Sequence, residues 1–228
     1  LYPMQGLSTI QLSQTLKLPY IPVTHVENLC ASATEAMRGA AYALASRCCD
    51  VALCIGVEKL KDVGYGGLPD LRPPQEQYWA ANASGPGTYA MMATRYFSRY
   101  GLSPEEGKRM IARATWKSHQ NGAKHPKAHL RKAVDLDAII NAPIIAWPLG
   151  LFDCCGVSDG AAAAIMVRAE DAKKYRKDPV YVKSLQIAAA SGEDMWYTDY
   201  DYTRAETGFR AGQRAYAEAG IKNPREEL

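Results

Sequence analysis

The first residues of the chain show two contrasting hydrophobic patterns. Between residues 4 and 18, apolar side chains recur at helical spacing, which predicts an amphipathic helix with Leu7, Ile10 and Leu16 on its apolar face. The stretch that follows, YIPVTHVE at residues 20–27, is rich in β-branched residues. Such a stretch is typical of a β-strand, so a helix followed by a strand is expected here.

A second helix and a second strand are predicted directly afterwards. Ser32 and Glu35 have the spacing of a capping box, in which each side chain bonds the other's backbone, and small residues follow on one helical face. The uninterrupted apolar run VALCIGV at residues 51–57 predicts a strand buried on both faces. Strand, helix and strand in this order predict a βαβ unit, which is expected to be parallel.

The pattern changes in residues 63–147, which we interpret as an insertion between sheet elements. It begins with a stretch at 63–88 that is rich in Gly and Pro and has no clear period. Two helices are predicted next. One spans 89–100 and is closed by Gly101, and the other starts with the capping-box sequence SPEE and runs to about residue 118. A basic loop, HQNGAKHPKAHLRK, is expected after them.

Sheet character returns near the end of the chain. SDGAAAAIMV at residues 158–167 predicts a turn and a strand, AEDAKKYR a short helix, and VYVKSLQIAAA at 180–190 another strand. The last 25 residues have an amphipathic pattern, with Phe209, Ala215 and Tyr216 as candidate core positions. The alternation of helices and strands predicts an α/β fold.

Composition narrows the function without defining it. The 228 residues are 47% hydrophobic and 22% charged, with a net charge of +3, which gives no reason to expect nucleic acid or a membrane as a partner. No apolar run reaches the roughly 20 residues that span a bilayer. The six cysteines are too few for a disulfide framework and contain no C-x-x-C, so we expect reduced cysteines, no metal site and a cytoplasmic location.

Cys30 is the candidate nucleophile. It lies in VENLCASATEAM, between the predicted strand at 20–27 and the predicted helix. The first amides of a helix lack partners and form the positive end of its dipole, so they favour a thiolate and could also stabilise an oxyanion. A small buried cysteine at a turn would explain the same position. The residues alone leave both readings open.

Three segments carry a resemblance to a known family. VENLCASATEAMRGAAYALASRCCDVALCIGVEKLKD at 26–62 resembles the nucleophile segment of the thiolases, and WPLGLFDCCGVSDGAAAAIMV at 147–167 resembles a second thiolase signature. SHQNGAKHPKAHLR at 118–131 is similar to their loop domain. The resemblance is closest to the sterol-carrier-protein-type thiolases and related acetyl-CoA acetyltransferases.

The resemblance implies an α/β thiolase fold with α-β-α-β-α layers built from two similar halves. The N-terminal half would comprise residues 1–62 and 148–178, with the loop domain inserted at 63–147. Residues 179–228 would begin the C-terminal half.

Some motifs of the family are not found in this sequence. They are the activating histidine in G-H-P, the N-E-A-F or H-D-C-F segment and the late C-x-G cysteine, all of which belong to the second half. The resemblance therefore implies an internal fragment of a longer thiolase, or one part of a split enzyme. His25, five residues before Cys30, is interpreted as a core or interface histidine rather than the missing base.

The implied function is acyl transfer on an acyl-CoA or 3-ketoacyl-CoA in lipid metabolism, through an acyl-cysteine at Cys30. Coenzyme A would be a substrate, with no permanently bound cofactor, and the assembly would be a homodimer or a dimer of dimers. Lys124, His125, Lys127 and Arg131 are candidate contacts of the CoA phosphates, although a solvated basic loop explains them equally well.

Two alternatives remain open. One is a thiolase-fold retro-aldolase of sterol side-chain degradation that works with an OB-fold partner. The other is a truncated, non-catalytic subunit that binds acyl-CoA or has a structural role.

Overall fold

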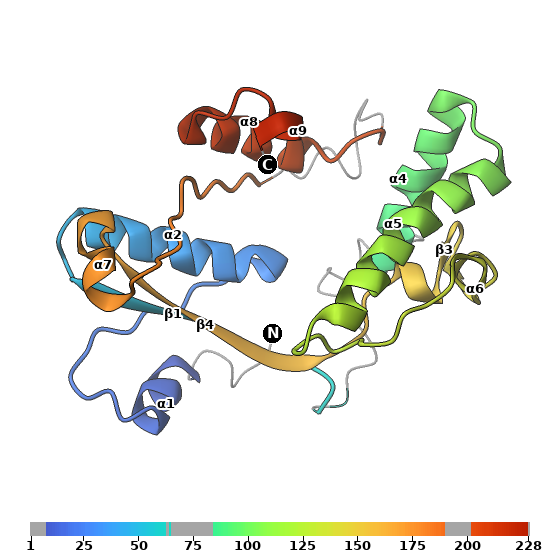
Figure 1. The fold of residues 1–228 in the computed structure, drawn as a ribbon. Helices are drawn as coiled ribbons and strands as arrows, with labels where there is room; N and C mark the ends of the chain where they lie inside the picture. The colour runs from blue at the N-terminus through green and yellow to red at the C-terminus, as the bar shows by residue number, and fades with distance from the viewer. Residues whose placement is uncertain (1–7, 63, 65–83, 190–201, 228) are drawn as a thin grey trace, which may run out of the picture. The chain divides into compact units, whose positions relative to one another are not determined.

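The computed structural model describes residues 8–62, 64, 84–189 and 202–227 (Figure 1). The chain divides into two compact units, and each is described by itself. Unit 1 comprises Leu1–Glu58, Gly160–Ala189 and Thr207–Leu228, and unit 2 comprises Lys59–Asp159 and Ala190–Glu206. No helix within the described ranges combines the length and the hydropathy needed to cross a membrane.

Unit 1 contains a pair of strands and several helices. In chain order its elements are α1 (Ser8–Thr15), the 3-10 turn η2 (Leu29–Ala31), α2 (Ser32–Ala45), β1 (Val51–Lys59), β4 (Asp159–Val167), η4 (Ala169–Asp171), α7 (Ala172–Tyr175), α8 (Glu206–Ala219) and α9 (Pro224–Glu227). α1 lies within the predicted helix 4–18, of which residues 4–7 fall outside the described residues. The strands β1 and β4 and the short helix after β4 are confirmed.

The two strands pair with each other, and polar contacts hold the pair at both ends. At one end the Asp159 carboxylate accepts a hydrogen bond from the Lys61 amide at 2.8 Å. At the other end Arg168 donates to the Cys49 carbonyl at 3.1 Å and to the Asp50 carboxylate at 2.6 Å. Because the start of each strand meets the end of the other, β1 and β4 are antiparallel.

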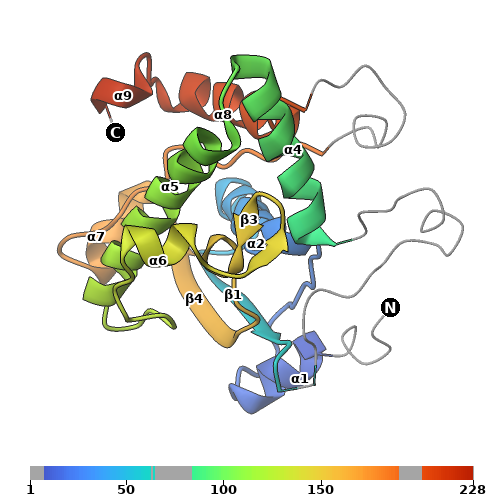
Figure 2. The same ribbon diagram turned by 90° about the vertical axis from the view of Figure 1, so that its right-hand side faces the viewer.

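α2 covers one face of this strand pair, as Figures 1 and 2 show. Cys54 on β1 is buried, with its sulfur 3.8 Å from the Ala36 carbonyl oxygen of α2 and 3.7 Å from the Met166 sulfur of β4. Close approach is possible because both contact surfaces carry small residues; Gly56, for example, faces the Cβ of Ala33.

The opposite face of the strand pair is largely uncovered. The prediction that residues 51–57 form a strand buried on both faces is therefore wrong for the described chain. Among the described residues, α1 and Leu16 after it are what packs on this side, against part of the surface. The side chains of Val51, Leu53, Val57 and Ile165 remain 45%, 44%, 59% and 70% exposed.

Two further predicted strands are not formed. Residues 21–27 have no regular secondary structure and are mostly exposed, and Tyr20 before them lies in a turn with a φ of 60°. No described residue pairs with them in a sheet, so the predicted βαβ unit is also wrong. Residues 180–189 likewise form no strand, and residue 190 lies outside the described residues. β-branched residues favour an extended backbone, but a strand forms only where a second strand offers hydrogen-bonding groups. Neither stretch finds such a partner among the described residues.

The predicted C-terminal helix is confirmed as α8, but its candidate core positions are not core residues. Phe209 and Tyr216 are 43% and 37% exposed, and Ala215 is half-buried. α8 is connected to the preceding extended stretch of unit 1 through Glu218, which accepts hydrogen bonds from Ser184 at 2.5 Å and Gln186 at 2.7 Å.

Unit 2 is built mainly on two helices. Its elements are α4 (Gly85–Tyr100), α5 (Pro104–Lys124), α6 (Leu136–Ile140), β2 (Ile144–Ala146), β3 (Leu149–Gly150) and η3 (Leu151–Asp153). β2 and β3 form an antiparallel pair in which Ile144 faces Gly150.

The C-terminal end of α4 and the start of α5 follow the sequence signals, although α4 begins at Gly85, four residues before the predicted start. Gly101 closes α4 with a φ of 64°, a left-handed conformation that costs glycine little. In the capping box of α5, the Ser103 amide donates to Glu106 at 2.9 Å and the Glu106 amide donates to the Ser103 hydroxyl at 3.2 Å. Both predictions are confirmed.

α5 extends further than predicted. The helix runs to Lys124, so the first part of the predicted basic loop is helical. Nothing in the intervening residues breaks a helix until Pro126, which disfavours helical backbone at the residue before it. His125 accordingly has an extended conformation, with φ −96° and ψ 121°.

A buried ion pair connects α5 to the β3–η3 turn. Lys108 of α5 and Asp153 of η3 are in contact at 2.5 Å, and their side chains are only 5% and 1% exposed. The remaining capacity of the carboxylate is used by the Thr115 hydroxyl at 2.6 Å and the Gly150 amide at 2.8 Å. A buried carboxylate and ammonium are tolerated because each is paired and the carboxylate is fully hydrogen-bonded.

Replacing Asp153 with Asn tests this interaction. We expect the variant Asp153→Asn to destabilise unit 2 by about 3–5 kcal/mol, because Lys108 would keep its buried charge without a counter-charge. Urea unfolding followed by tryptophan fluorescence measures this, since Trp116 and Trp147 both belong to unit 2. The exposed Asp137→Ala is the matched control and should cost less than about 1 kcal/mol. Equal losses in the two variants would contradict the role given to Asp153.

Candidate functional site

Cys30 lies in a strained turn at the start of α2. It is the middle residue of η2, and Leu29 before it has a φ of 45°. This left-handed conformation costs a residue with a Cβ atom roughly 1–2 kcal/mol. Leu29 is also 69% exposed, so burial of its side chain does not offset the cost. The turn therefore requires other contacts to hold it.

Hydrogen bonds within a short stretch hold this turn. The Leu29 amide donates to the Glu27 carboxylate at 2.6 Å, and the Asn28 amide donates to the Ser32 hydroxyl at 2.7 Å. The same hydroxyl donates to the Leu29 carbonyl at 2.7 Å. Ser32 and Glu27 thus fix both sides of the strained residue, and the backbone on either side of Cys30 is tied down.

The predicted capping box of Ser32 and Glu35 is wrong. Ser32 is already the first residue of α2, and its hydroxyl bonds the preceding turn instead of a helix amide. Glu35 forms an ion pair with Arg38 at 2.9 Å, and this hydrogen bond lowers the pKa of the Glu35 carboxyl. The Ser32 hydroxyl, which a capping box would require, is instead hydrogen-bonded within the strained turn.

The functional atoms of Cys30 are accessible. Its side chain is exposed, and its sulfur has no hydrogen-bond partner among the described residues. Its backbone amide is likewise without an acceptor there, because the turn's bonds run from the amides of Ala31 and Ser32. An exposed thiol therefore lies directly beside an N–H group that has no acceptor among the described residues, and this is the donor type that stabilises an oxyanion.

His25, five residues before Cys30, is not buried beside this turn. It precedes the turn and is exposed, so the core alternative is wrong, whereas its interpretation as an interface histidine stays a prediction. Since no base contacts the Cys30 sulfur, the described chain contains a positioned thiol but no activating partner for it.

The four candidate CoA contacts all belong to unit 2, whereas Cys30 belongs to unit 1. Lys124, His125, Lys127 and Arg131 are all exposed. They cluster where α5 ends, as two local bonds show. The Lys127 amide donates to the His125 ring at 3.2 Å, and Arg131 donates to the Pro126 carbonyl at 3.2 Å. The carbonyl end of a helix attracts cations, which accounts for part of this basic cluster without a ligand.

Cys54 and Cys154 differ from Cys30 in environment. Burial raises the pKa of the Cys54 thiol. Burial, followed by the nearby Asp153 charge, also raises the pKa of Cys154. Nowhere in the described ranges do three or more His, Cys, Asp or Glu side chains gather in a way that could hold a metal ion.

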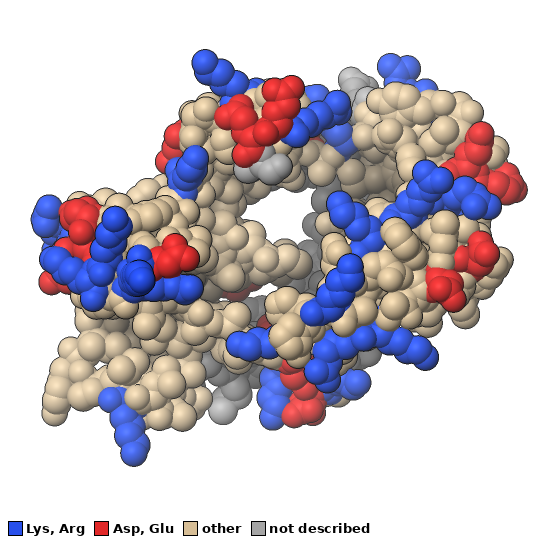
Figure 3. All heavy atoms as spheres, in the orientation of Figure 1, with Lys and Arg blue, Asp and Glu red and all other residues tan. Residues whose placement is uncertain are grey.

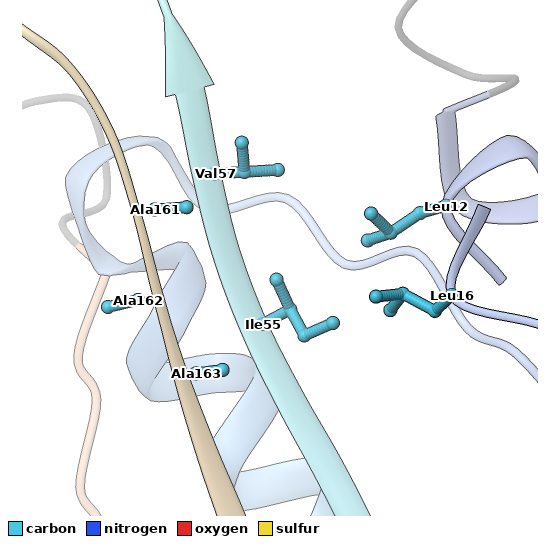
Figure 4. A pocket seen from close by; sticks show the side chains of 7 residues that line it. All are labelled: Leu12, Leu16, Ile55, Val57, Ala161, Ala162 and Ala163. Atoms are coloured by element: carbon cyan, nitrogen blue, oxygen red, sulfur yellow. The ribbon is translucent and has the colours of Figure 1, made fainter.

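An apolar pocket of about 290 Å³ lies on the uncovered side of the strand pair (Figure 4). Leu12 of α1 and Leu16, which follows the helix, point toward Ile55 of β1 across it. Its lining residues contain no polar side chain, so it offers surface for packing and no chemistry. They are Leu12, Leu16, Ile55, Val57, Ala161, Ala162 and Ala163.

Comparisons with known proteins agree on one family. The family described as "Thiolase, N-terminal domain" matches residues 9–170. The acetyl-CoA acetyltransferases of Methanothermobacter thermautotrophicus and Methanocaldococcus jannaschii are each 36% identical to this chain, over 88% and 89% of its length. The match covers 51% of each of them, so the chain spans about half the length of these relatives.

More distant matches include a lipid-carrier protein and an aldolase. Sterol carrier protein 2 of Gallus gallus is 25% identical over 91% of this chain and 40% of its own length. The solved structure titled "Ltp2-ChsH2(DUF35) aldolase" matches with a TM-score of 0.72 and 25% identity, covering 94% of this chain and 56% of that one.

Alkylation rates test the accessibility of Cys30. With iodoacetamide at neutral pH, we expect Cys30 to be labelled at least about tenfold faster than Cys54, because burial shields Cys54 and raises its pKa, which reduces its thiolate fraction. Peptide mass spectrometry after timed quenching measures both sites. Unfolding in urea should bring the two rates together. Equal rates in the folded chain would contradict the described burial.

Proposed function

Because this chain belongs to the thiolase family, we propose that it carries the nucleophile of a CoA-dependent acyltransferase, with Cys30 as the acylated residue. One observation carries the proposal: an exposed thiol lies beside its own free amide, on a strained turn at the start of α2. Strain of this kind persists where surrounding contacts enforce it and is frequent at active sites.

The proposed step is attack of the Cys30 thiolate on the carbonyl carbon of an acyl-CoA thioester. The carbonyl oxygen becomes an oxyanion, and the Cys30 amide N–H donates a hydrogen bond to it. When the tetrahedral intermediate collapses, the carbon–sulfur bond to CoA breaks, leaving acyl-Cys30 and CoA thiolate. The thiol proton of Cys30, held meanwhile by a base, is returned to CoA.

The base of this step is not provided by the described residues around Cys30. Cysteine nucleophiles need an adjacent base or a strongly lowered pKa to react rapidly. The relatives are about twice as long as this chain, and we propose that their additional half supplies the base and a further oxyanion donor. The chain alone would then be acylated slowly and would not turn over.

Coenzyme A is the proposed substrate rather than a resident cofactor, and the proposed assembly is a homodimer or a dimer of dimers. The basic cluster at the end of α5, comprising Lys124, His125, Lys127 and Arg131, is the proposed contact of the CoA phosphates. Its exposure allows such contacts, and all four residues extend from one short stretch.

A retro-aldolase is the second candidate. It is favoured by the match to the solved aldolase, whose title includes a DUF35 partner. Carbon–carbon cleavage by this route would not acylate Cys30. The accessible thiol beside its free amide supports acyl transfer over cleavage, and the following experiment separates the two.

Incubation with radiolabelled acetyl-CoA tests the nucleophile. We expect up to one acetyl group per wild-type chain, located on Cys30 by peptide mass spectrometry and accompanied by an equal amount of free CoA. Cys30→Ser should incorporate none, whereas Cys48→Ser, which removes another exposed thiol, should behave like the wild type. Acetoacetyl-CoA with CoA should give no multiple turnover. An unlabelled wild-type chain would overturn the acyltransferase proposal and favour the aldolase or a non-catalytic role.

A triple substitution tests the basic cluster. Lys124→Ala, Lys127→Ala and Arg131→Ala together should raise the Kd of CoA about tenfold, the combined effect expected of a few exposed charge pairs. Calorimetry at low salt measures the affinity, and Lys177→Ala is the control for a general loss of positive charge. An unchanged Kd would mean that these cations interact with the carbonyl end of α5 and do not bind the CoA phosphates.

A further inference from the structure

A shallow groove on unit 2 shares no residue with the Cys30 turn or with the basic cluster. It has a volume of about 430 Å³ and lies between α5 and the start of α6. Its lining is almost entirely apolar and comes from Trp116, Leu136 and the aliphatic parts of the Arg113 and Lys117 side chains. Figure 3 shows lysine and arginine side chains gathered over α5.

The groove is held in place by local structure. Trp116, Arg113 and Lys117 project from one rigid helix. Across from them, the Gln120 side chain donates to the Val134 carbonyl at 3.2 Å and so ties the segment before Leu136 to α5. The indole of Trp116 nevertheless remains 42% exposed. A large aromatic side chain is thus displayed on a fixed surface instead of being buried.

The charge around the groove is not balanced within the described chain. Arg113 and Lys117 are exposed, and neither forms an ion pair or a side-chain hydrogen bond with a described residue. Arg109 precedes them by one further turn, so three cations follow one another at spacings of four along α5, where like charges repel. Asp135 and Asp137 adjoin Leu136 in sequence but do not line the groove.

This combination has the character of a protein-binding surface. Trp and Arg are the side chains that most often dominate the binding energy of interfaces. A small-molecule site, in contrast, encloses most of its ligand, which an open groove with four lining residues does not. Exposed cations at the rim, which form no ion pair within the described chain, favour a partner of opposite charge.

We propose that this groove docks an acidic segment of a partner protein. A large apolar side chain of that segment packs on Trp116 and Leu136, and carboxylates on either side of it pair with Arg113 and Lys117. The proposal goes beyond the acyl-transfer function, because the groove contributes no residue to it.

A designed peptide tests the groove directly. The probe is a fluorescein-labelled peptide Glu-Asp-Glu-Leu-Phe-Glu-Asp-Glu, and its binding to the 228-residue chain is followed by fluorescence anisotropy at low salt. A control peptide keeps every carboxylate but replaces Leu-Phe with Ser-Gly. We expect the first peptide to bind at least about tenfold more tightly than the control, because the apolar pair adds contact with Trp116.

Variants of the groove locate the binding. Trp116→Ala and the double variant Arg113→Glu with Lys117→Glu should each weaken the probe about tenfold or more, whereas Arg99→Ala on α4 should leave it unchanged. Circular dichroism verifies that each variant is folded. Equal binding of the two peptides, or equal binding by the wild type and the groove variants, would overturn the proposal and reduce the effect to non-specific charge attraction.

Discussion

The pairing of β1 with β4 is the contact on which the described fold depends. Its polar contacts join residues far apart in the chain, since Lys61 and Asp159 are separated by 98 positions and Asp50 and Arg168 by 118. Loop-closure cost grows only slowly with length, so a long insertion between the strands is tolerated once both ends are secured. Arg168 secures one end. Its side chain is only 13% exposed and donates hydrogen bonds to the Cys49 carbonyl and the Asp50 carboxylate. The strand pair in turn provides the surface on which α2 packs, and α2 begins at the turn that holds Cys30.

The sequence predicted those elements whose signals lie within a few consecutive residues. Gly101 and the Ser103–Glu106 capping box define helix ends by local bonds alone, and both are found as predicted. The stretches 20–27 and 180–189 were predicted as strands and are not, because a strand depends on a partner that β-propensity does not specify. For the fold as a whole, the family resemblance was more informative than β-propensity. Segments 26–62 and 147–167 indicated the thiolase family and its α/β fold. The family match and the solved structure confirm both.

At the candidate site, the sequence indicated the residue but not the geometry around it. Cys30 was singled out because it precedes a helix, and the structure places it there, exposed. The left-handed conformation of Leu29 was not predictable, since sequence favours such backbone at glycine or asparagine rather than leucine. The buried pair of Lys108 and Asp153 was missed for a similar reason, because charged side chains are normally exposed and their sequence separation of 45 gives no signal.

The contacts that hold the Cys30 turn are all local. Glu27 and Ser32 hold the strained Leu29 through hydrogen bonds that span no more than four residues. The position of the thiol and its neighbouring amide is therefore set by one short segment and the helix that follows it. A base has the opposite requirement, because it must approach the sulfur from another segment without disturbing that turn. An exposed sulfur without a hydrogen-bond partner in the described chain leaves that approach open. A thiol positioned by local bonds can thus be fully placed by one half of a protein, which is compatible with the proposal that its base belongs to another.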